Sequence, residues 1–166
     1  EDGGSFVANC RKKAAGYAVA LGQWVLADDS GLVVPALGGA PGVDSALYAG
    51  VHGNDEANND KLLREMASLQ GTQRDAYYVC VLALADPSGA IVAESEGRCG
   101  GRIAPARSGQ GGFGYDPLFV LPEYHQTFGE LSPRVKAALS HRARALERIL
   151  PAIDEALWRA LPGAIC

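Results

Sequence analysis

A β-hairpin in the middle of the chain is the feature that most constrains the fold. Residues 74–85 are rich in apolar, aromatic and β-branched side chains, which is typical of a strand. Residues 86–89 read Asp-Pro-Ser-Gly, a sequence that favours a tight turn, and residues 90–98 return as the partner strand. Because a tight turn joins antiparallel strands, the sheet must contain at least one antiparallel pair.

Helix and strand patterns alternate around this hairpin. The predicted helices cover residues 5–21, 54–69, 132–150 and 152–161, and the further predicted strands cover 24–27, 32–34, 100–104 and 118–120. Ser5 and Gly22 start and stop the first helix, Ser132 and Pro133 start the third, and Pro151 starts the fourth. This alternation together with the hairpin predicts an α/β fold with a mixed sheet.

The composition is that of one globular domain. The chain has 166 residues, of which 48% are hydrophobic and 20% are charged. No apolar run approaches the ~20 residues that a membrane span needs, so no membrane association is expected. Four cysteines without a C-x-x-C pair indicate neither a zinc site nor a redox site. They fit a protein of the reducing cytoplasm, with Cys10 and Cys80 in the core.

The charge distribution indicates a small anionic ligand. The net charge of -4 argues against a nucleic-acid polymer as partner, because proteins that bind such polymers are usually basic. Basic side chains nevertheless gather between Arg134 and Arg148, where only Glu147 opposes them. A local basic stretch in an acidic protein fits an anionic small molecule, although a solvated helix face would look the same.

Two adjacent aspartates, Asp28 and Asp29, directly follow the apolar run 24–27. The sequence Asp-Asp-Ser-Gly at residues 28–31 predicts a turn in which the two carboxylates point to different sides of the backbone. Buried carboxylates are costly unless they are paired, and Mg²⁺ takes one or two carboxylates together with phosphate oxygens and water. The pair therefore predicts a magnesium site that also orients or deprotonates water, with an ordinary turn as the alternative.

A glycine-rich segment, residues 111–117, is a candidate ligand loop. Its glycines allow the backbone to approach a ligand closely, and Phe113 and Tyr115 could stack on a base. Asp116 could accept hydrogen bonds from a base edge or hold the loop. The alternative is an ordinary glycine-rich connection with both rings in the core.

A third candidate lies in the helix predicted after Ser132. Lys136 and Ser140 are four residues apart, which places them on one helical face, and His141 and Arg142 follow. Arginine gives planar, bidentate recognition that lysine cannot give, so this group could bind phosphates or a purine edge. His141 could equally be a core or helix-terminal histidine.

Taken in this order, the motifs resemble the inosine triphosphate pyrophosphatase family, which acts on non-canonical purine nucleotides. The resemblance covers essentially the whole chain, and its signatures are residues 26–32, 36–43, 111–117 and 139–143. It implies Mg²⁺-dependent hydrolysis of the purine nucleoside triphosphates ITP, dITP and XTP to the monophosphate and pyrophosphate, which removes them from the nucleotide pool. It also implies an elongated mixed β-sheet flanked by helices in two lobes with a central cleft, and a homodimer.

The resemblance further implies roles for individual residues. Asp29 matches the proton acceptor and metal-binding aspartate, with Asp28 supporting it, and Glu1 matches a metal-associated glutamate in an E-x-G-x-x-F pattern. Lys13 matches a lysine that contacts the phosphates. The other implied substrate contacts are Ser30, the nucleoside loop of Phe113, Gly114, Tyr115 and Asp116, and the base-recognition group of Lys136, His141 and Arg142. Donors in this last group would favour a C6 oxygen over the amino group of adenine.

The sequence departs from the family pattern in two places. The family opens with a strand and a T/S-x-N-x-x-K phosphate loop, so the chain is expected to be a single pyrophosphatase domain, residues 1–166, that lacks this opening. Leu47 stands where the family usually has arginine, which affects the expected affinity or specificity. These departures motivate one alternative, a nucleotide-binding module of the same fold with weak or no catalysis. A related pyrophosphatase for modified pyrimidine nucleotides is a second alternative.

Overall fold

The computed structural model describes residues 4–160, and the elements below belong to that range. The helices are α1 (Phe6–Leu21), α2 (Asp55–Glu65), α3 (Pro133–Leu139) and α4 (His141–Ala160), and short 3₁₀ turns cover Pro35–Leu37, Gly42–Asp44 and Gly71–Arg74. The strands are β1 (Val25–Val33), β2 (Asp75–Ala85), β3 (Ile91–Ile103), β4 (Phe119–Leu121) and β5 (Gln126–Thr127). The predicted α/β class is thereby confirmed.

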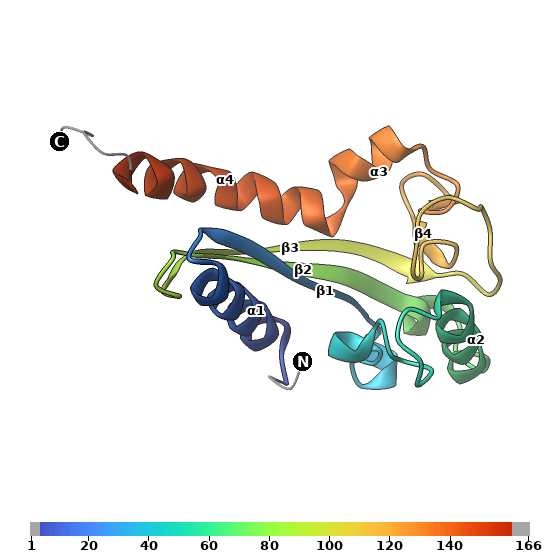
Figure 1. Cartoon of the computed structure of the whole chain (residues 1–166). Helices are drawn as coiled ribbons and strands as arrows, with labels where there is room; N and C mark the ends of the chain where they lie inside the picture. Colours follow the sequence, from blue (N-terminus) through green and yellow to red (C-terminus); the bar gives the residue numbers. More distant parts are fainter. Residues whose placement is uncertain (1–3, 161–166) are drawn as a thin grey trace. The chain divides into compact units, whose positions relative to one another are not determined.

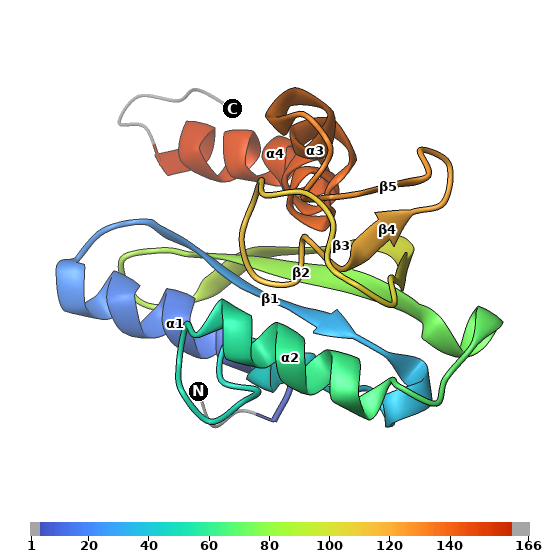
Figure 2. The same ribbon diagram turned by 90° about the vertical axis from the view of Figure 1, so that its right-hand side faces the viewer.

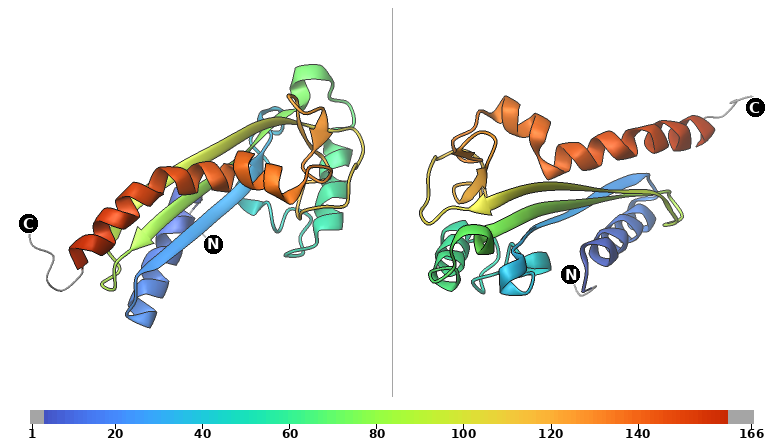
Figure 3. Two further views of the ribbon diagram at one scale, coloured as in Figure 1. Left: turned by 90° about the horizontal axis from the view of Figure 1, so that it is seen from above. Right: turned by 180° about the vertical axis from the view of Figure 1, so that it is seen from behind.

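The described strands form one sheet in the order β1-β2-β3-β4-β5. The predicted hairpin is present, and β2 and β3 run side by side to the turn at residues 86–89 (Figure 3). The Asp86 carboxylate closes this turn, because it accepts hydrogen bonds from the backbone N–H groups of Ser88 and Ala90 at 2.8 and 3.1 Å. The pairs β3–β4 and β4–β5 are antiparallel as well, so the sheet is antiparallel and the expected mixed sheet is corrected. Alternating helices and strands had suggested parallel pairs, but each neighbour in this sheet reverses direction.

The chain divides into two compact units. Among the described residues, unit 1 comprises 4–29, 80–97 and 142–160, and unit 2 comprises Ser30–Val79 and Arg98–His141. The chain passes between them at four points, three of which lie inside the strands β1, β2 and β3.

In unit 1 each face of the sheet is covered by one helix, α1 on one face and α4 on the other (Figure 1). Side chains of β2 alternate between these helices, as strand geometry requires. Val81, Ala83 and Ala85 pack with Cys10, Ala14 and Ala18 of α1. Cys80 and Leu82 pack with Ala145 and Ile149 of α4, which confirms the prediction that Cys10 and Cys80 are core residues.

Unit 2 has its own hydrophobic core. Leu62 and Met66 at the C-terminal end of α2 (green in Figure 2) are fully buried in it, together with Leu118 and Phe119. A buried guanidinium, that of Arg74, satisfies the carbonyl oxygens of Met66 at 2.8 Å and Ile103 at 2.7 Å. Burial lowers the pKa of this guanidinium, and its hydrogen bonds hold the end of α2 to the end of β3.

The turn predicted at residues 28–31 is wrong. The segment Asp28 to Gly31 is not a turn, because β1 runs through it without interruption from Val25 to Val33. The turn preference of Asp, Ser and Gly is local, and pairing of the whole strand with β2 overrides it.

The C-terminal helices also divide differently from the prediction. The helix that starts at Pro133 ends at Leu139, because Ser140 is extended (φ -65°, ψ 158°). From His141 onward α4 is continuous and contains Pro151, so this proline does not start a helix. The two strands predicted at residues 90–98 and 100–104 likewise form the single strand β3.

Candidate functional site

Asp28 and Asp29 lie on opposite faces of β1 because successive side chains of a strand alternate. Asp29 is 6% exposed and shares its face with Val25 and Ala27, which pack against α1. Asp28 is exposed and lines a hollow on the α4 face with Leu82 and Leu146. The two carboxylates therefore work in different surroundings and do not face one common site within unit 1.

Asp29 is paired with Lys13 of α1. The ammonium of Lys13 lies 2.7 Å from Asp29 Oδ1, and the lysine side chain is 29% exposed against 8% for the aspartate. Taking Asp29 out of water costs free energy, and this pairing offsets it. The structure thus brings together the two residues of unit 1 to which the resemblance assigns the phosphates and the attacking water.

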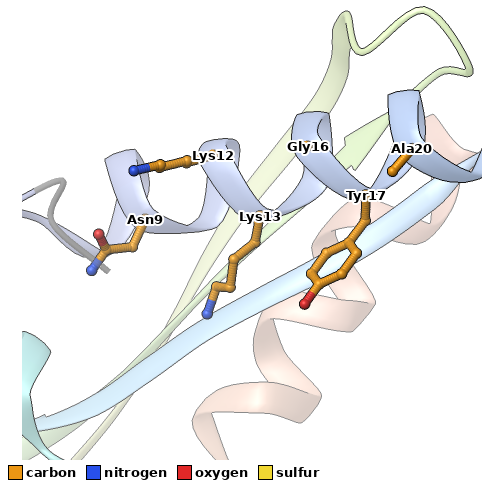
Figure 4. A pocket seen from close by; sticks show the side chains of 6 residues that line it. All are labelled: Asn9, Lys12, Lys13, Gly16, Tyr17 and Ala20. Carbon is orange, nitrogen blue, oxygen red and sulfur yellow. The ribbon is translucent and has the colours of Figure 1, made fainter.

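The position of Lys13 depends on α1, and both ends of this helix are fixed by local caps. The Ser5 side chain accepts a hydrogen bond from the backbone N–H of Ala8, and Gly22 ends the helix in the left-handed conformation (φ 60°). Asn9, Lys13 and Tyr17 then project from the same side of α1, spaced by four residues (Figure 4). They line a groove of about 310 Å³. The outer end of Lys13 is therefore accessible while the same ammonium holds Asp29.

The buried thiol of Cys10 lies near the Lys13–Asp29 pair. Cys10 is fully buried, and its Sγ donates toward the carbonyl oxygens of Ala27 and Val81, both at 3.3 Å. Burial raises the pKa of the Cys10 thiol to about 11, with Lys13 acting in the opposite direction. The thiol is therefore protonated at neutral pH and serves as a core residue.

Arg142 forms the corresponding pair on the other face. Its Nε lies 3.1 Å from Asp28 Oδ2, and the two side chains are 44% and 45% exposed. Arg142 belongs to the first turn of α4, so the break at Ser140 sets its position. Arg142, predicted to contact the base, is thus held by Asp28, which is predicted to support catalysis.

In unit 2 the glycine-rich loop is organised around Asp116. This carboxylate is 3% exposed, and its Oδ2 accepts a hydrogen bond from the backbone N–H of Phe113 at 2.7 Å and another from the ammonium of Lys136. Gly112 is required here, because its φ is +82° and a Cβ at this position would lie 2.0 Å from Asp116 Oδ2. The structure therefore brings Asp116 and Lys136, two of the predicted substrate contacts, together at the loop.

The two aromatic rings of the loop have different surroundings. Tyr115 is 3% exposed and donates its hydroxyl hydrogen to the Ser45 carbonyl at 2.8 Å, and burial raises its pKa. Phe113 is 60% exposed, and the Lys136 ammonium lies 4.5 Å from its ring centroid. Phe113 alone of these two rings offers a face to a ligand, while Tyr115 anchors the loop in the core.

The residue after Phe113 is held by α2. The backbone N–H of Gly114 donates to Asp55 Oδ2 at 2.6 Å, and its carbonyl accepts from Asn59 Nδ2 at 2.8 Å. Sequence reasoning assigned no site role to these two residues. The available signal was their spacing of four on the helix, which places both side chains on one face.

The remaining predicted residues have varied positions. His141 is 5% exposed and its ring stacks on Tyr78, with centroids 4.7 Å apart and planes at 13°. Ser30 is half-buried within β1, and the Leu47 side chain is largely exposed. The predicted metal ligand Glu1 lies outside the described residues.

The donor chemistry of unit 1 fits magnesium. Within residues 4–160 no group of three or more His, Cys, Asp or Glu side chains gathers into a metal site. Mg²⁺ needs only one or two carboxylates when phosphate oxygens and water complete its shell. A single buried carboxylate beside a lysine, as at Asp29, meets that requirement.

No helix among residues 4–160 is long and apolar enough to cross a bilayer.

Comparisons with known proteins agree with the motifs. Residues 1–152 match the Ham1 family. The dITP/XTP pyrophosphatase of Rhodopirellula baltica is 60% identical over 151 residues, which cover 91% of this chain and 73% of that relative. Among solved structures, a HAM1 protein from Coxiella burnetii superposes with a TM-score of 0.86 at 39% identity, covering 93% of this chain and 79% of that one. The nucleoside-triphosphatase / dITP/XTP pyrophosphatase from Mycobacterium abscessus gives a TM-score of 0.78 at 44% identity, covering 92% and 78%.

The chain belongs to the Ham1 family. The resemblance drawn from the four sequence segments is thereby confirmed at the level of the family.

Proposed function

We propose that this protein hydrolyses the non-canonical purine nucleoside triphosphates dITP, XTP and ITP to the monophosphate and pyrophosphate, and so removes them from the nucleotide pool. One observation carries the proposal: a chain 60% identical to a dITP/XTP pyrophosphatase holds a buried carboxylate, Asp29, against a groove-lining lysine, Lys13. The sequence identity to the relative supports the choice of reaction, and the Asp29–Lys13 pair consists of residues that suit this reaction.

Mg²⁺ is the cofactor that fits this donor set. Asp29 would hold it, together with Glu1 as the resemblance implies. When bound, Mg²⁺ supplies positive charge that neutralises the phosphate oxygens and the leaving pyrophosphate.

The protein residues of unit 1 would perform two tasks. Lys13 binds the anionic triphosphate and stabilises charge as the phosphoanhydride bond breaks. Asp29 accepts a hydrogen bond from the attacking water and takes its proton. In the free protein the Lys13 ammonium lies 2.7 Å from Asp29 Oδ1, so the two groups that would act on the triphosphate and the water are held side by side.

A second group of residues would select the base. Phe113 offers an exposed ring for stacking, and Asp116 with Lys136 supplies hydrogen-bonding groups beside it. His141 and Arg142 are the proposed donors to the oxygen at purine C6. Adenine carries an amino group there, so these donors would stay unsatisfied and the canonical nucleotide would bind poorly.

Four other expectations stay predictions. They are the two lobes with a central cleft, the homodimer, the single pyrophosphatase domain and the cytoplasmic location. The assays below are therefore best made with the full-length protein, whose intact mass and molar mass in solution are measured first.

The decisive experiment is an assay of pyrophosphate release from ITP and XTP with Mg²⁺. We expect release by the wild type, at least a ~100-fold loss of kcat in Asp29→Asn, and no activity after EDTA treatment until Mg²⁺ is restored. Wild-type release no higher than that of Asp29→Asn would leave a nucleotide-binding module in place of an enzyme. Faster hydrolysis of dUTP or 5-methyl-UTP than of ITP would indicate a pyrimidine enzyme.

A further inference from the structure

We propose that Asp55 and Asn59 of α2 are positioning residues that orient the Phe113 ring for base binding. The inference rests on the proposed function, because it concerns the base platform of that same site. The proposal gives α2 a role in substrate affinity that no motif in the sequence of this helix indicates.

The contacts hold one residue of the loop from both sides. Asp55 Oδ2 accepts from the Gly114 N–H at 2.6 Å, and Asn59 Nδ2 donates to the Gly114 carbonyl at 2.8 Å. Asn59 Nδ2 also donates to the backbone carbonyl of Asp55 at 2.7 Å, and Asn59 is 3% exposed. A hydrogen bond to a carboxylate and one made by a buried amide are both costly to lose.

The preceding peptide is held as well. The Phe113 N–H donates to Asp116 Oδ2 at 2.7 Å, so the peptide groups before and after the Phe113 Cα are each bound to a carboxylate. With both peptide planes fixed, φ and ψ of Phe113 are fixed. The direction of the Phe113 side chain then follows from the backbone, because rotamers depend on φ and ψ.

This matters because much of the Phe113 ring is exposed to solvent. It is 60% exposed, and the Lys136 ammonium lies 4.5 Å from its centroid. A mobile ring would lose conformational entropy on stacking, whereas a ring fixed in advance does not. α2 is a firm base for this purpose, since Leu62 and Met66 are fully buried and Arg74 binds the Met66 carbonyl.

The experiment separates positioning from a general effect on the helix. Asp55→Ala and Asn59→Leu remove the two contacts, and Asp55→Asn retains an oxygen that can accept from Gly114. Glu56→Ala is the matched control, because it also removes one carboxylate from the first turn of α2 and affects the helix dipole equally. Steady-state kinetics with ITP are compared with inhibition by inorganic tripolyphosphate, a ligand that has no base.

We expect Asp55→Ala and Asn59→Leu to raise KM for ITP roughly fivefold to tenfold, with kcat within about twofold of wild type. Asp55→Asn and Glu56→Ala should stay near the wild-type KM, and the inhibition constant of tripolyphosphate should be the same in all proteins. Equal effects of Asp55→Ala and Glu56→Ala, or a parallel loss of tripolyphosphate binding, would overturn the inference.

A measurement that does not depend on catalysis distinguishes a failure of this inference from a failure of the proposed function. Calorimetric binding of IMP should weaken in Asp55→Ala and Asn59→Leu but not in Glu56→Ala. If the wild type released no pyrophosphate, the proposed function would fail while this IMP series still tested the role of α2. An unchanged IMP affinity in all variants would reject the inference even in an active enzyme.

Discussion

At the scale of single residues, the two adjacent aspartates of β1 have different partners. Asp29 is buried and pairs with Lys13, whereas Asp28 is half-exposed and pairs with Arg142. Exposed ion pairs contribute about 0.2–1 kcal/mol, which corresponds to less than about fivefold in an equilibrium or a rate. The structure therefore predicts unequal effects of the same substitution at neighbouring positions.

We expect Asp28→Asn to change kcat/KM for ITP by less than about tenfold, mainly through KM, because Arg142 loses its partner. Asp29→Asn, the matched variant one residue away, should lower kcat at least ~100-fold. Combining Asp28→Asn with Arg142→Gln in a double-mutant cycle measures the coupling of the pair. A kcat loss in Asp28→Asn as large as that in Asp29→Asn would show that both carboxylates act on the reaction.

The buried thiol of Cys10 makes stability depend on alkaline pH. Its pKa is about 11 in the fold and near 9 in the unfolded chain, so the unfolded state releases the proton first. The stabilisation is complete below about pH 9 and is lost as pH rises toward 11, by at most about 2–3 kcal/mol. Urea unfolding at about pH 8 and about pH 10.5 measures this loss. In Cys10→Ala the fall should be smaller, and identical falls in both proteins would rule out the thiol as its cause.

At the scale of elements, Pro151 lies inside α4 and lowers the stability of the fold. Proline lacks the N–H that would bind the carbonyl four residues earlier in the helix, and the Pro151 side chain is exposed, so it adds no burial in return. Pro151→Ala should therefore raise the free energy of unfolding by about 1–2 kcal/mol, since the gain in helix propensity exceeds the entropy returned to the unfolded chain.

The control for this substitution is Pro87→Ala. Pro87 lies in the hairpin turn, where the Gly89 N–H donates to the Asp86 carbonyl at 2.9 Å and proline suits the backbone. Urea unfolding of both variants should show stabilisation only at position 151. A less stable Pro151→Ala protein would mean that the proline shapes α4 for another purpose.

The sequence predicted the elements whose signals are local. α1 begins after Ser5 and ends before Gly22 because a side-chain cap and a left-handed glycine act within one turn. The continuity of β1 and the break at Ser140 depend on partners distant in the chain, and they were predicted wrongly. In the site, the resemblance supplied Lys13 and Asp29. The contacts of Gly114 with Asp55 and Asn59 span 59 and 55 residues, and the spacing of these two residues on one helical face does not by itself identify Gly114 as their partner.

At the scale of the whole molecule, neither unit is a continuous piece of sequence. The chain changes unit inside β1, β2 and β3, so each of these strands contributes residues to both units. Neither unit can therefore be excised as one segment. This connectivity favours cooperative unfolding.

We expect one unfolding transition. Trp24 and Trp158 both belong to unit 1, so tryptophan fluorescence reports that unit, while far-ultraviolet circular dichroism also reports α2 and α3 of unit 2. The two signals should give the same urea midpoint. Separate midpoints would show that the units unfold independently despite the shared strands.

The alternation along β1 has a consequence for how the gene can change. A strand repeats every two residues, so deletion or insertion of one codon between Val25 and Ala27 would turn the aspartates to the opposite faces. An insertion would place Asp28 where Asp29 now faces Lys13, and a deletion would place Asp29 where Asp28 now faces Arg142. We expect length changes of a single residue there to be eliminated by selection far more strictly than substitutions of the exposed Leu26, because they turn both carboxylates away from their partners without altering either one.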